Sequence, residues 1–585
     1  MNTELKNCQN CKQNFTIEPE DFQFYKKIDV PPPTWCPECR LERRLIWRNE
    51  RVFFKRKDDA SGKNIVSGFP SDVPFPIYER DYWWSDAWDP MQYGRDFDPS
   101  RPFLEQFREL LQVVPWPSRS VINMVNSEYS DQAGGLKNCY LCFNCDYLEN
   151  STYVVRGNTS KDCSDSLQVQ GSELCYDSTF IDKSFRAFYS LDCGGSTDMW
   201  FSKQCVGCTN CFGCVNLKKK NYYIWNKPYS KEEYFKKLKE FNLGSRKAIG
   251  ELKKKAYAFW NQFPSKYYRG IRNVNSSGDM LVDTKNTRES WWVSEAEDMR
   301  YCQALYLKSA DCYDYTVWGD RASRIYECLT CGQEVDSLKF CFDCWPSSQE
   351  LEYCLTCHSS SNLFGCIGLK KKQYCILNKQ YSKEEYEKLR KEIIAQMNAM
   401  PYVDTKKRVY TYGEFFPKEF SPFAYNDTML QDVFPLDESE AIAKGYQWRN
   451  PDMKEYEGAM KGDDIPDLIG DVTDEITEEV INCSLCNRAY RIVPAELDFH
   501  RRIEAPLSNT CINCRHIERF KFINPPRFIS RKCECAGAKS DTGVYTNLAE
   551  HFHKIDHCPN TFETAYGTTF SEIVYCEECY QVEVV

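Results

Sequence analysis

The middle of the chain repeats a pattern of small and apolar residues with a period of twelve residues, beginning at Lys137. Three columns of this repeat hold Cys, Ser, Ala, Val and similar residues, with polar residues, Asp, Asn and Gly between them. The third column reads Cys139, Ser151, Cys163, Cys175, Ala187, Met199, Cys211 and Tyr223. The pattern predicts a β-solenoid, whose coils stack about 4.8 Å apart around a narrow bore. Met199 and Tyr223 fit such a bore poorly, so a coil of twice this length, made of two half-turns, stays open, as does the handedness.

A second, looser array follows the first. Residues 211–240 match residues 363–392 at 20 of 30 positions. Upstream of this second copy, CxxC pairs recur every thirteen residues, at Cys328/Cys331, Cys341/Cys344 and Cys354/Cys357. The repeat predicts a second solenoid, in which adjacent coils would place two CxxC pairs face to face. These pairs are therefore candidates for additional metal binding.

Both arrays end in the same helix signal. Ser230 with Glu233, and Ser382 with Glu385, form S-x-x-E capping boxes. Apolar residues follow at helical spacing, so a helix is predicted after each array. An amphipathic helix would cover the strand edge at the end of a solenoid, which otherwise recruits another chain.

Paired CxxC knuckles stand near both ends of the chain. In each segment, 24 residues separate the two knuckles. The four pairs are Cys8/Cys11, Cys36/Cys39, Cys483/Cys486 and Cys511/Cys514. A CxxC turn points two thiolates at one ion, and two such knuckles complete a tetrahedral zinc site. Since four thiolates leave no position for water, each end is predicted to hold a structural zinc, not a catalytic one.

The two terminal segments are an internal duplication. When their knuckles are aligned, Phe24 meets Phe499. The same alignment places Arg40 opposite Arg515 and Arg44 opposite Arg519.

A third zinc site is predicted close to the C-terminus. The expected ligands are Cys533, Cys535, Cys576 and Cys579, with His553 or Cys558 as substitutes. The total is then about three zinc ions per chain. The alternative is that the segment HFHKIDHC is a polar helix or loop without a metal.

Both terminal segments resemble the bacterial "probable zinc-ribbon" family, in which a CxxC knuckle leads to an FY-type aromatic pair and a CPxCR knuckle. Here these elements are the Cys8 knuckle, Phe24-Tyr25 and Cys36-Pro-Glu-Cys39-Arg40. The C-terminal copy departs from the family with Phe499-His500 and Cys511-Ile-Asn-Cys514-Arg515. This resemblance implies a binding module. The whole chain resembles a group of cysteine-rich zinc-ribbon proteins from small-genome uncultivated bacteria, which implies no particular function.

The stretch CVGCTNCFGC, residues 205–214, has two interpretations. Its four cysteines fall on columns of the first repeat, where a compact and weakly polar thiol packs well. This favours buried structural thiols, and a metal or redox cluster is the alternative.

Composition and charge indicate a cytoplasmic protein. The apolar runs are far shorter than the ~20 residues that a bilayer span requires, and the first residues lack the apolar segment of a secretory signal. In the cytosol, 33 cysteines are expected to bind metal or stay buried as thiols instead of forming disulfides. The net charge of −10 combines a basic stretch at 40–57 with an acidic one at 451–480.

The expected fold is mainly β and multidomain, with two short-rung β-solenoids that carry helical caps and are flanked by zinc ribbons. The expected segments are an N-terminal ribbon with a basic and aromatic extension (1–63), an aromatic and proline-rich packing segment (64–135), the first solenoid (136–229), a helical cap and linker (230–270), the second solenoid (271–381), its helical cap (382–400), an aromatic YGEFFP segment (401–450), an acidic linker (451–481) and the C-terminal ribbon with the third zinc site (482–585).

The function expected first is a non-enzymatic zinc-binding scaffold for nucleic acid, especially RNA or the ribosome. Basic and aromatic side chains interleave at 40–57, as backbone neutralisation and base stacking require. The candidate contacts are Arg40, Arg43, Arg44, Trp47, Arg48, Arg51, Lys55, Arg56, Arg515 and Arg519. The alternatives are a protein–protein interaction scaffold, or a metal-handling or redox protein that uses the CxxC rungs. The sequence shows no P-loop, HExxH or GxSxG motif, so an enzyme is the least favoured interpretation and no small-molecule substrate is identified. The short apolar runs predict no membrane partner.

Overall fold

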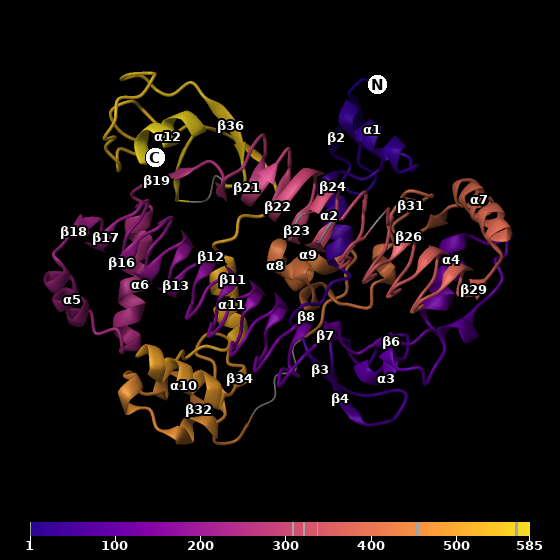
Figure 1. Cartoon of the computed structure of the whole chain (residues 1–585), viewed down its shortest axis with the longest axis horizontal. Coiled ribbons are helices and arrows are strands. Elements are labelled where there is room, and N and C mark those ends of the chain that lie inside the picture. Colours follow the sequence, from indigo (N-terminus) through magenta and orange to yellow (C-terminus); the bar gives the residue numbers. More distant parts are fainter. Residues whose placement is uncertain (1, 307–308, 320–321, 336, 451–455, 568–570) are drawn as a thin grey trace. The chain divides into compact units, whose positions relative to one another are not determined.

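The computed structural model describes residues 2–306, 309–319, 322–335, 337–450, 456–567 and 571–585. The chain folds into two compact units (Figure 1). Unit 1 comprises Met1–Arg119, Tyr268–Arg449 and Pro525–Phe528, and unit 2 comprises Ser120–Tyr267, Asn450–Asn524 and Ile529–Val585. Each unit combines one β-solenoid with one terminal ribbon-like module. The N-terminal module belongs with the second solenoid, and the C-terminal module with the first.

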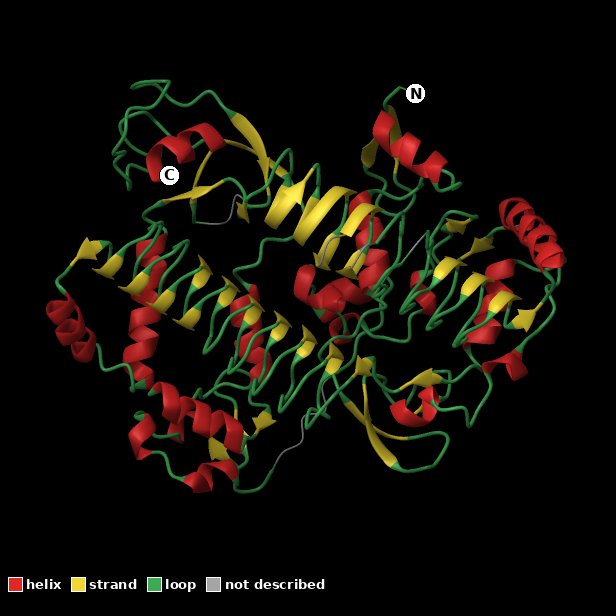
Figure 2. Cartoon of the chain, in the orientation of Figure 1, coloured by secondary structure: helices red, strands yellow, loops and turns green. Residues whose placement is uncertain are grey.

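The solenoid of unit 2 is a stack of parallel strands, short and separated by loops (Figure 2). Its strands are β7 (Val121–Ile122), β8 (Asp131–Gly134), β9 (Phe143–Asp146), β10 (Val155–Asn158), β11 (Leu167–Gln170), β12 (Thr179–Asp182), β13 (Phe185–Phe188), β14 (Leu191–Gly194), β15 (Thr197–Trp200), β16 (Thr209–Phe212) and β17 (Asn221–Ile224). Val155 pairs with Leu167, which pairs with Thr179, so one coil is twelve residues long. The stack begins at Val121, before the segment that the sequence assigned to it.

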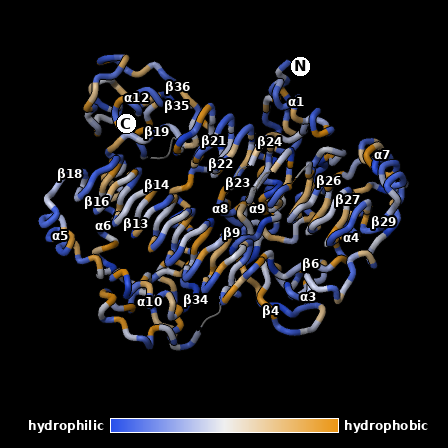
Figure 3. The backbone as a smooth tube through the Cα atoms, in the orientation of Figure 1, coloured by the Kyte–Doolittle hydropathy of each residue, from blue (hydrophilic) through white to orange (hydrophobic). Residues whose placement is uncertain are grey.

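Each coil is built from three-residue sides. Every third side chain points into the bore, and the residue before it has a positive φ. In one coil the buried residues are Cys139, Cys142, Cys145 and Leu148, and the left-handed residues are Asn138, Leu141, Asn144 and Tyr147. Asn and Asp tolerate this backbone conformation best among residues with a side chain, which explains their frequency between the columns. Hydrophobic and hydrophilic residues therefore alternate within each coil (Figure 3).

Three-residue sides give four inward columns in a twelve-residue coil, one more than the sequence indicated. The additional column contains Ser160, Ser172, Ser184, Ser196 and Cys208, all buried. Met199 also lies inside, at 0% exposure.

Serine and cysteine side chains in the bore accept hydrogen bonds from buried backbone N–H groups of the next coil. The N–H of Ser196 donates to Ser184 Oγ at 3.1 Å, and that hydroxyl donates to the carbonyl of Asp182 at 2.9 Å. Cys145 does the same, because its Sγ accepts from the N–H of Gly157 at 3.2 Å and lies 3.2 Å from the carbonyl of Phe143. A buried N–H requires a partner, so the columns select small side chains that both donate and accept.

Replacing Ser184 with valine is expected to destabilise the solenoid of unit 2 by about 1–3 kcal/mol, because the buried N–H of Ser196 loses its acceptor. The Ser184→Cys variant retains an acceptor and is the matched control. Hydrogen exchange of residues 184–196 measures the difference. Equal protection in the two variants would contradict the ladder.

The solenoid of unit 1 is built in the same way but less regularly. Its strands are β20 (Gly270–Ile271), β21 (Gly278–Lys285), β22 (Ser290–Arg300), β23 (Gln303–Tyr306), β24 (Ser309–Tyr313), β25 (Thr316–Gly319), β26 (Gln349–Glu352), β27 (Ser361–Phe364) and β28 (Gln373–Ile376). Gly278 pairs with Ser290, twelve residues on, whereas Gln303 pairs with Thr316, thirteen residues on.

Both solenoids end in an asparagine clamp and a helix. The amide of Asn226 bonds the N–H of Val215 at 2.9 Å and its carbonyl at 3.0 Å, in place of a further strand. Asn378 makes the same pair of bonds to Ile367, each at 2.8 Å. Antiparallel strands and capped helices follow in both units: β18 (Lys227–Pro228), α5 (Lys231–Glu240) and α6 (Arg246–Trp260), then β29 (Lys379–Gln380) and α7 (Lys383–Ala399). The capping boxes at Ser230 and Ser382 are confirmed.

The aromatic segments of unit 1 pack on its solenoid. They contain α3 (Arg80–Trp84), α4 (Phe103–Leu111), α8 (Met429–Val433) and α9 (Glu438–Ala443). Phe103 contacts Phe364 edge to face, with ring centroids 5.1 Å apart.

The acidic segment predicted to be a linker contributes to a core in its described part. Ile465, Val472 and Ile476 are buried with Leu497 in one cluster, because apolar residues alternate with the acids. Residues 451–455 lie outside the described residues.

Among the described helices, none has the length and apolar composition that crossing a membrane would require.

Candidate metal centres

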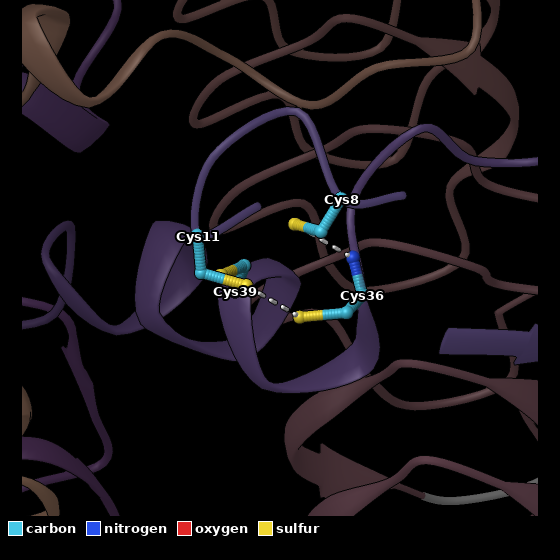
Figure 4. Close-up of side chains that lie close together, drawn as sticks. All are labelled: Cys8, Cys11, Cys36 and Cys39. Carbon is cyan, nitrogen blue, oxygen red and sulfur yellow. Dashed lines mark hydrogen bonds between the residues drawn. The ribbon is translucent and has the colours of Figure 1, made fainter. Parts of the chain in front are cut away.

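The N-terminal module gathers four cysteines. Its elements are β1 (Glu4–Asn7), β2 (Asn14–Ile17), α1 (Pro19–Lys27) and α2 (Pro37–Leu45). Cys8 and Cys11 lie on the turn between the two strands, and Cys36 and Cys39 lie at the start of α2. Their sulfurs lie within 4.8 Å of one another and point toward a common centre (Figure 4). Cys11 and Cys36 are 3.8 Å apart, the edge of a tetrahedron with metal–sulfur bonds of about 2.3 Å.

The second four-cysteine cluster lies in the C-terminal ribbon, formed by β33 (Ile481–Asn482), β34 (Ala489–Tyr490), α10 (Pro494–Ile503) and α11 (Ile512–Phe520). Cys483 and Cys514 are 3.8 Å apart, and Cys486 and Cys511 are 3.6 Å apart. Burial raises the pKa of Cys483, but backbone N–H donors from Cys511 and the CxxC turn outweigh it and lower this pKa to about 7. The turn therefore favours the thiolate that a metal requires.

The third cluster has a different membership from the one expected. It lies in the C-terminal module, which contains β35 (Ile529–Lys532), β36 (Thr561–Thr564), β37 (Ile573–Tyr575) and α12 (Glu577–Val584). The four sulfurs brought together are those of Cys533, Cys558, Cys576 and Cys579. Cys558 takes the place expected for Cys535, because its segment runs beside that of Cys533: the N–H of Cys533 donates to the carbonyl of Asn560 at 2.9 Å. Cys535 lies instead in a second group with His551, His553 and Cys579.

Helix α2, which begins at the N-terminal cluster, is bound to the solenoid of unit 1 by buried arginines. Arg40, Arg43, Arg44 and Arg48 are each at most 1% exposed. The ion pairs to the solenoid and to the YGEFFP segment are Arg40–Asp314 (2.7 Å), Arg43–Glu327 (2.6 Å), Arg43–Glu414 (2.8 Å) and Arg44–Glu327 (3.3 Å). The four-cysteine cluster thus lies at the start of a helix whose arginines hold the module on the solenoid.

Helix α11 makes the equivalent contacts in unit 2. Arg515 pairs with Glu496 at 2.9 Å and also with Asp165. Arg519 pairs with Asp165 at 3.0 Å and with Asp177 at 3.3 Å.

The two docking arrangements share two aligned arginines and their carboxylate partners, whereas Glu518 of α11 stands at the position of Arg43. Asp165 and Asp177 lie on adjacent coils, as Asp314 and Glu327 do. A tyrosine hydroxyl from each solenoid completes the match: Tyr153 donates to Glu496 at 2.8 Å, and Tyr301 donates to Asp21 at 3.3 Å. Asp21 and Glu496 occupy the same position in the aligned modules. Corresponding contacts on the two solenoids therefore accompany the repeated cysteine knuckles.

Most side chains expected to contact nucleic acid are used inside the units. Arg515 and Arg519 are 7% and 3% exposed, Trp47 is fully buried, and Arg56 is 8% exposed. Arg51 is half-buried and pairs with Asp432 at 2.8 Å. Of the ten candidates, Lys55 alone is exposed. The arginines pair with carboxylates on the solenoids, and the sequence pattern does not reveal this use because these carboxylates lie far away in the chain.

The solenoid cysteines are buried thiols. All four cysteines of the CVGCTNCFGC stretch are 0% exposed. Cys214 Sγ lies 3.4 Å from the carbonyl of Phe212 and 3.5 Å from that of Tyr223, as a protonated donor would. Burial raises the pKa of Cys205 well above its usual value. Within the described residues, the groups able to hold a metal include no solenoid cysteine.

No protein-family model matches the chain, and no curated protein matches it.

Proposed function

We propose that this protein is a non-enzymatic scaffold in which structural zinc holds two ribbon modules against two β-solenoids. The observation that carries this proposal is that each of the two ribbon clusters lies at the start of a helix whose buried arginines pair with carboxylates of a solenoid. Four thiolates in a tetrahedral arrangement are the ligand set of structural zinc and leave no open position for substrate. The metal therefore supports the architecture.

The surface of the solenoids favours a protein partner over nucleic acid. Charges on successive coils compensate each other, as Lys137 with Glu149 at 2.8 Å and Lys161 with Glu173 at 3.6 Å. A polyanion requires positive charge that is not neutralised in this way. The chain as a whole carries a net charge of −10.

Metal content and RNA binding test this proposal. Full-length protein purified without chelator is expected to contain zinc in each ribbon and in the C-terminal module, measured by plasma mass spectrometry. Structured RNA at low salt is expected not to bind in a filter assay. Absence of zinc would refute the scaffold, and RNA binding that weakens steeply with salt would favour the nucleic-acid alternative.

Thiol labelling separates the two kinds of cysteine. The clusters contain thirteen of the 33 cysteines, and the solenoids contain the other twenty. In the native chain, an alkylating reagent is expected to label the thirteen only after a chelator is added. The remaining twenty are expected to react only after the protein is unfolded, because all of them are buried. Labelling or oxidation of solenoid cysteines in the native state would support the redox alternative instead.

A further inference from the structure

The C-terminal module contains seven metal-binding side chains where one tetrahedral ion requires four. They form two groups that share one residue. The first group is Cys533, Cys558, Cys576 and Cys579, and the second is Cys535, His551, His553 and Cys579. Within each group the ligand atoms lie within 4.8 Å of one another. We propose that this module binds two metal ions bridged by the thiolate of Cys579. The proposal extends the zinc scaffold proposed above.

The distances around Cys579 fit both sites. Its Sγ lies 3.7 Å from Cys558 Sγ, and Cys558 lies 3.9 Å from Cys576 Sγ. A tetrahedral ion with metal–sulfur bonds of about 2.3 Å requires sulfurs about 3.8 Å apart. On its other side, Cys579 Sγ lies 3.3 Å from His553 Nε2. That separation fits a sulfur–nitrogen edge of about 3.5 Å, since metal–nitrogen bonds are about 2.0–2.1 Å.

Both histidines are oriented as metal ligands. Nε2 of His551 bonds Glu583 Oε2 at 3.1 Å, and both side chains are fully buried. Nδ1 of His551 is buried and, among the described residues, has no hydrogen-bond partner. His553 is oriented the opposite way, because its Nδ1 bonds the carbonyl of Asp556 at 2.7 Å and leaves Nε2 for the metal. A metal-binding histidine usually donates its second ring N–H to a carboxylate or a carbonyl, and each histidine has one of these partners.

Glu583 is itself held in position. It accepts hydrogen bonds from the hydroxyl of Tyr545 at 2.7 Å and from the N–H groups of Leu548 at 2.6 Å and Ala549 at 3.2 Å. This carboxylate therefore fixes the orientation of His551 from α12, the same helix that carries Cys579.

Charge also favours a second ion. Five thiolates around one divalent ion would leave three negative charges in a buried module. A second divalent ion reduces this excess to one, which lowers the cost of burying the thiolates. The two sites would hold different ligand sets, four sulfurs in one and two sulfurs with two imidazoles in the other.

Zinc counting on the full-length chain tests the proposal. The wild-type protein is expected to contain four zinc ions, two in the ribbons and two in this module. The Cys535→Ser and His551→Ala variants are each expected to contain three, and Cys579→Ser is expected to contain two. His557→Ala is the matched control, because His557 lies in the same segment but is exposed and pairs with Asp541, so its zinc content stays at four.

The outcomes distinguish a failure of the two-ion centre from a failure of the zinc scaffold. Three zinc ions in the wild type, unchanged in Cys535→Ser and His551→Ala, would overturn the two-ion centre and leave the scaffold intact. Absence of zinc from the ribbons would refute the scaffold itself. Retention of two ribbon ions in each variant shows that the remainder of the chain is folded.

Cobalt(II) substitution tests the bridge. Two cobalt ions that share a thiolate couple magnetically, so the electron-paramagnetic-resonance intensity per ion is expected to be lower in the wild type than in Cys535→Ser. Equal intensity per ion in the two proteins would exclude a shared ligand.

Discussion

Replacing Cys511 with serine is expected to unfold the C-terminal ribbon while the solenoid of unit 2 stays folded. Cys511 is the N-cap of α11 and one of the four cysteines proposed to hold zinc, so its loss leaves three ligands and weakens the proposed site. Structural zinc contributes about 10–16 kcal/mol to the folding of such modules. Helices of nine and ten residues, as in this module, are too short to persist without that support.

Two measurements check this result. Zinc content is expected to fall by one ion, and backbone hydrogen exchange over residues 494–520 is expected to approach that of an unfolded chain. The control is Cys214→Ser, because Cys214 follows Ser202 in a column of the bore and serine restores the same ladder. The interpretation would be wrong if Cys511→Ser retained its zinc, or if the protection of α10 and α11 did not change.

The solenoids could be predicted because their periodicity is local. The bore holds mostly Ser, Cys, Ala and Val at every third position, with larger residues such as Leu148 and Met199 at single places, and this pattern is visible in one sequence. The left-handed corners were not predicted, since Tyr153 and Arg156 occupy them as well as Asn and Gly. Their conformation is imposed by coil stacking, which overrides the preference of the individual residue.

The role of the basic residues could not be predicted, because their partners lie far away in the chain. Arg40 and Asp314 are 274 residues apart in the chain, so the sequence gives the positive charge without its partner. A basic and aromatic stretch then resembles a surface for phosphate and bases. In the third cluster, Cys558 is separated from Cys533 by a long segment, and only the backbone pairing of that segment brings it into the site.

Replacing Arg515 with methionine is expected to destabilise unit 2 by about 3–5 kcal/mol. Arg515 is 7% exposed and pairs with Asp165 and Glu496, whose side chains are each 1% exposed. Removing the guanidinium leaves carboxylates buried without their main partner, and breaking a buried ion pair in this way costs about that much. Methionine retains much of the apolar volume of the side chain, so the loss of stability measures the contribution of charge and hydrogen bonding.

Urea unfolding measures the change in the free energy of unfolding, and hydrogen exchange shows whether α11 loses protection. Arg501→Met is the control. Arg501 belongs to the same module and pairs with Asp474 at 2.6 Å, but its side chain is 39% exposed and that of Asp474 is 83% exposed. Exposed pairs contribute less than about 1 kcal/mol, so this control should differ little from the wild type.

Adding Asp165→Asn and Glu496→Gln to Arg515→Met is expected to recover part of the stability, because no uncompensated charge then remains buried. Equal effects of Arg515→Met and Arg501→Met would mean that apolar packing alone holds the ribbon on its solenoid. The corresponding prediction for unit 1 is that Arg40→Met destabilises it, because Asp314 then keeps only its longer ion pair with Arg44 at 3.6 Å.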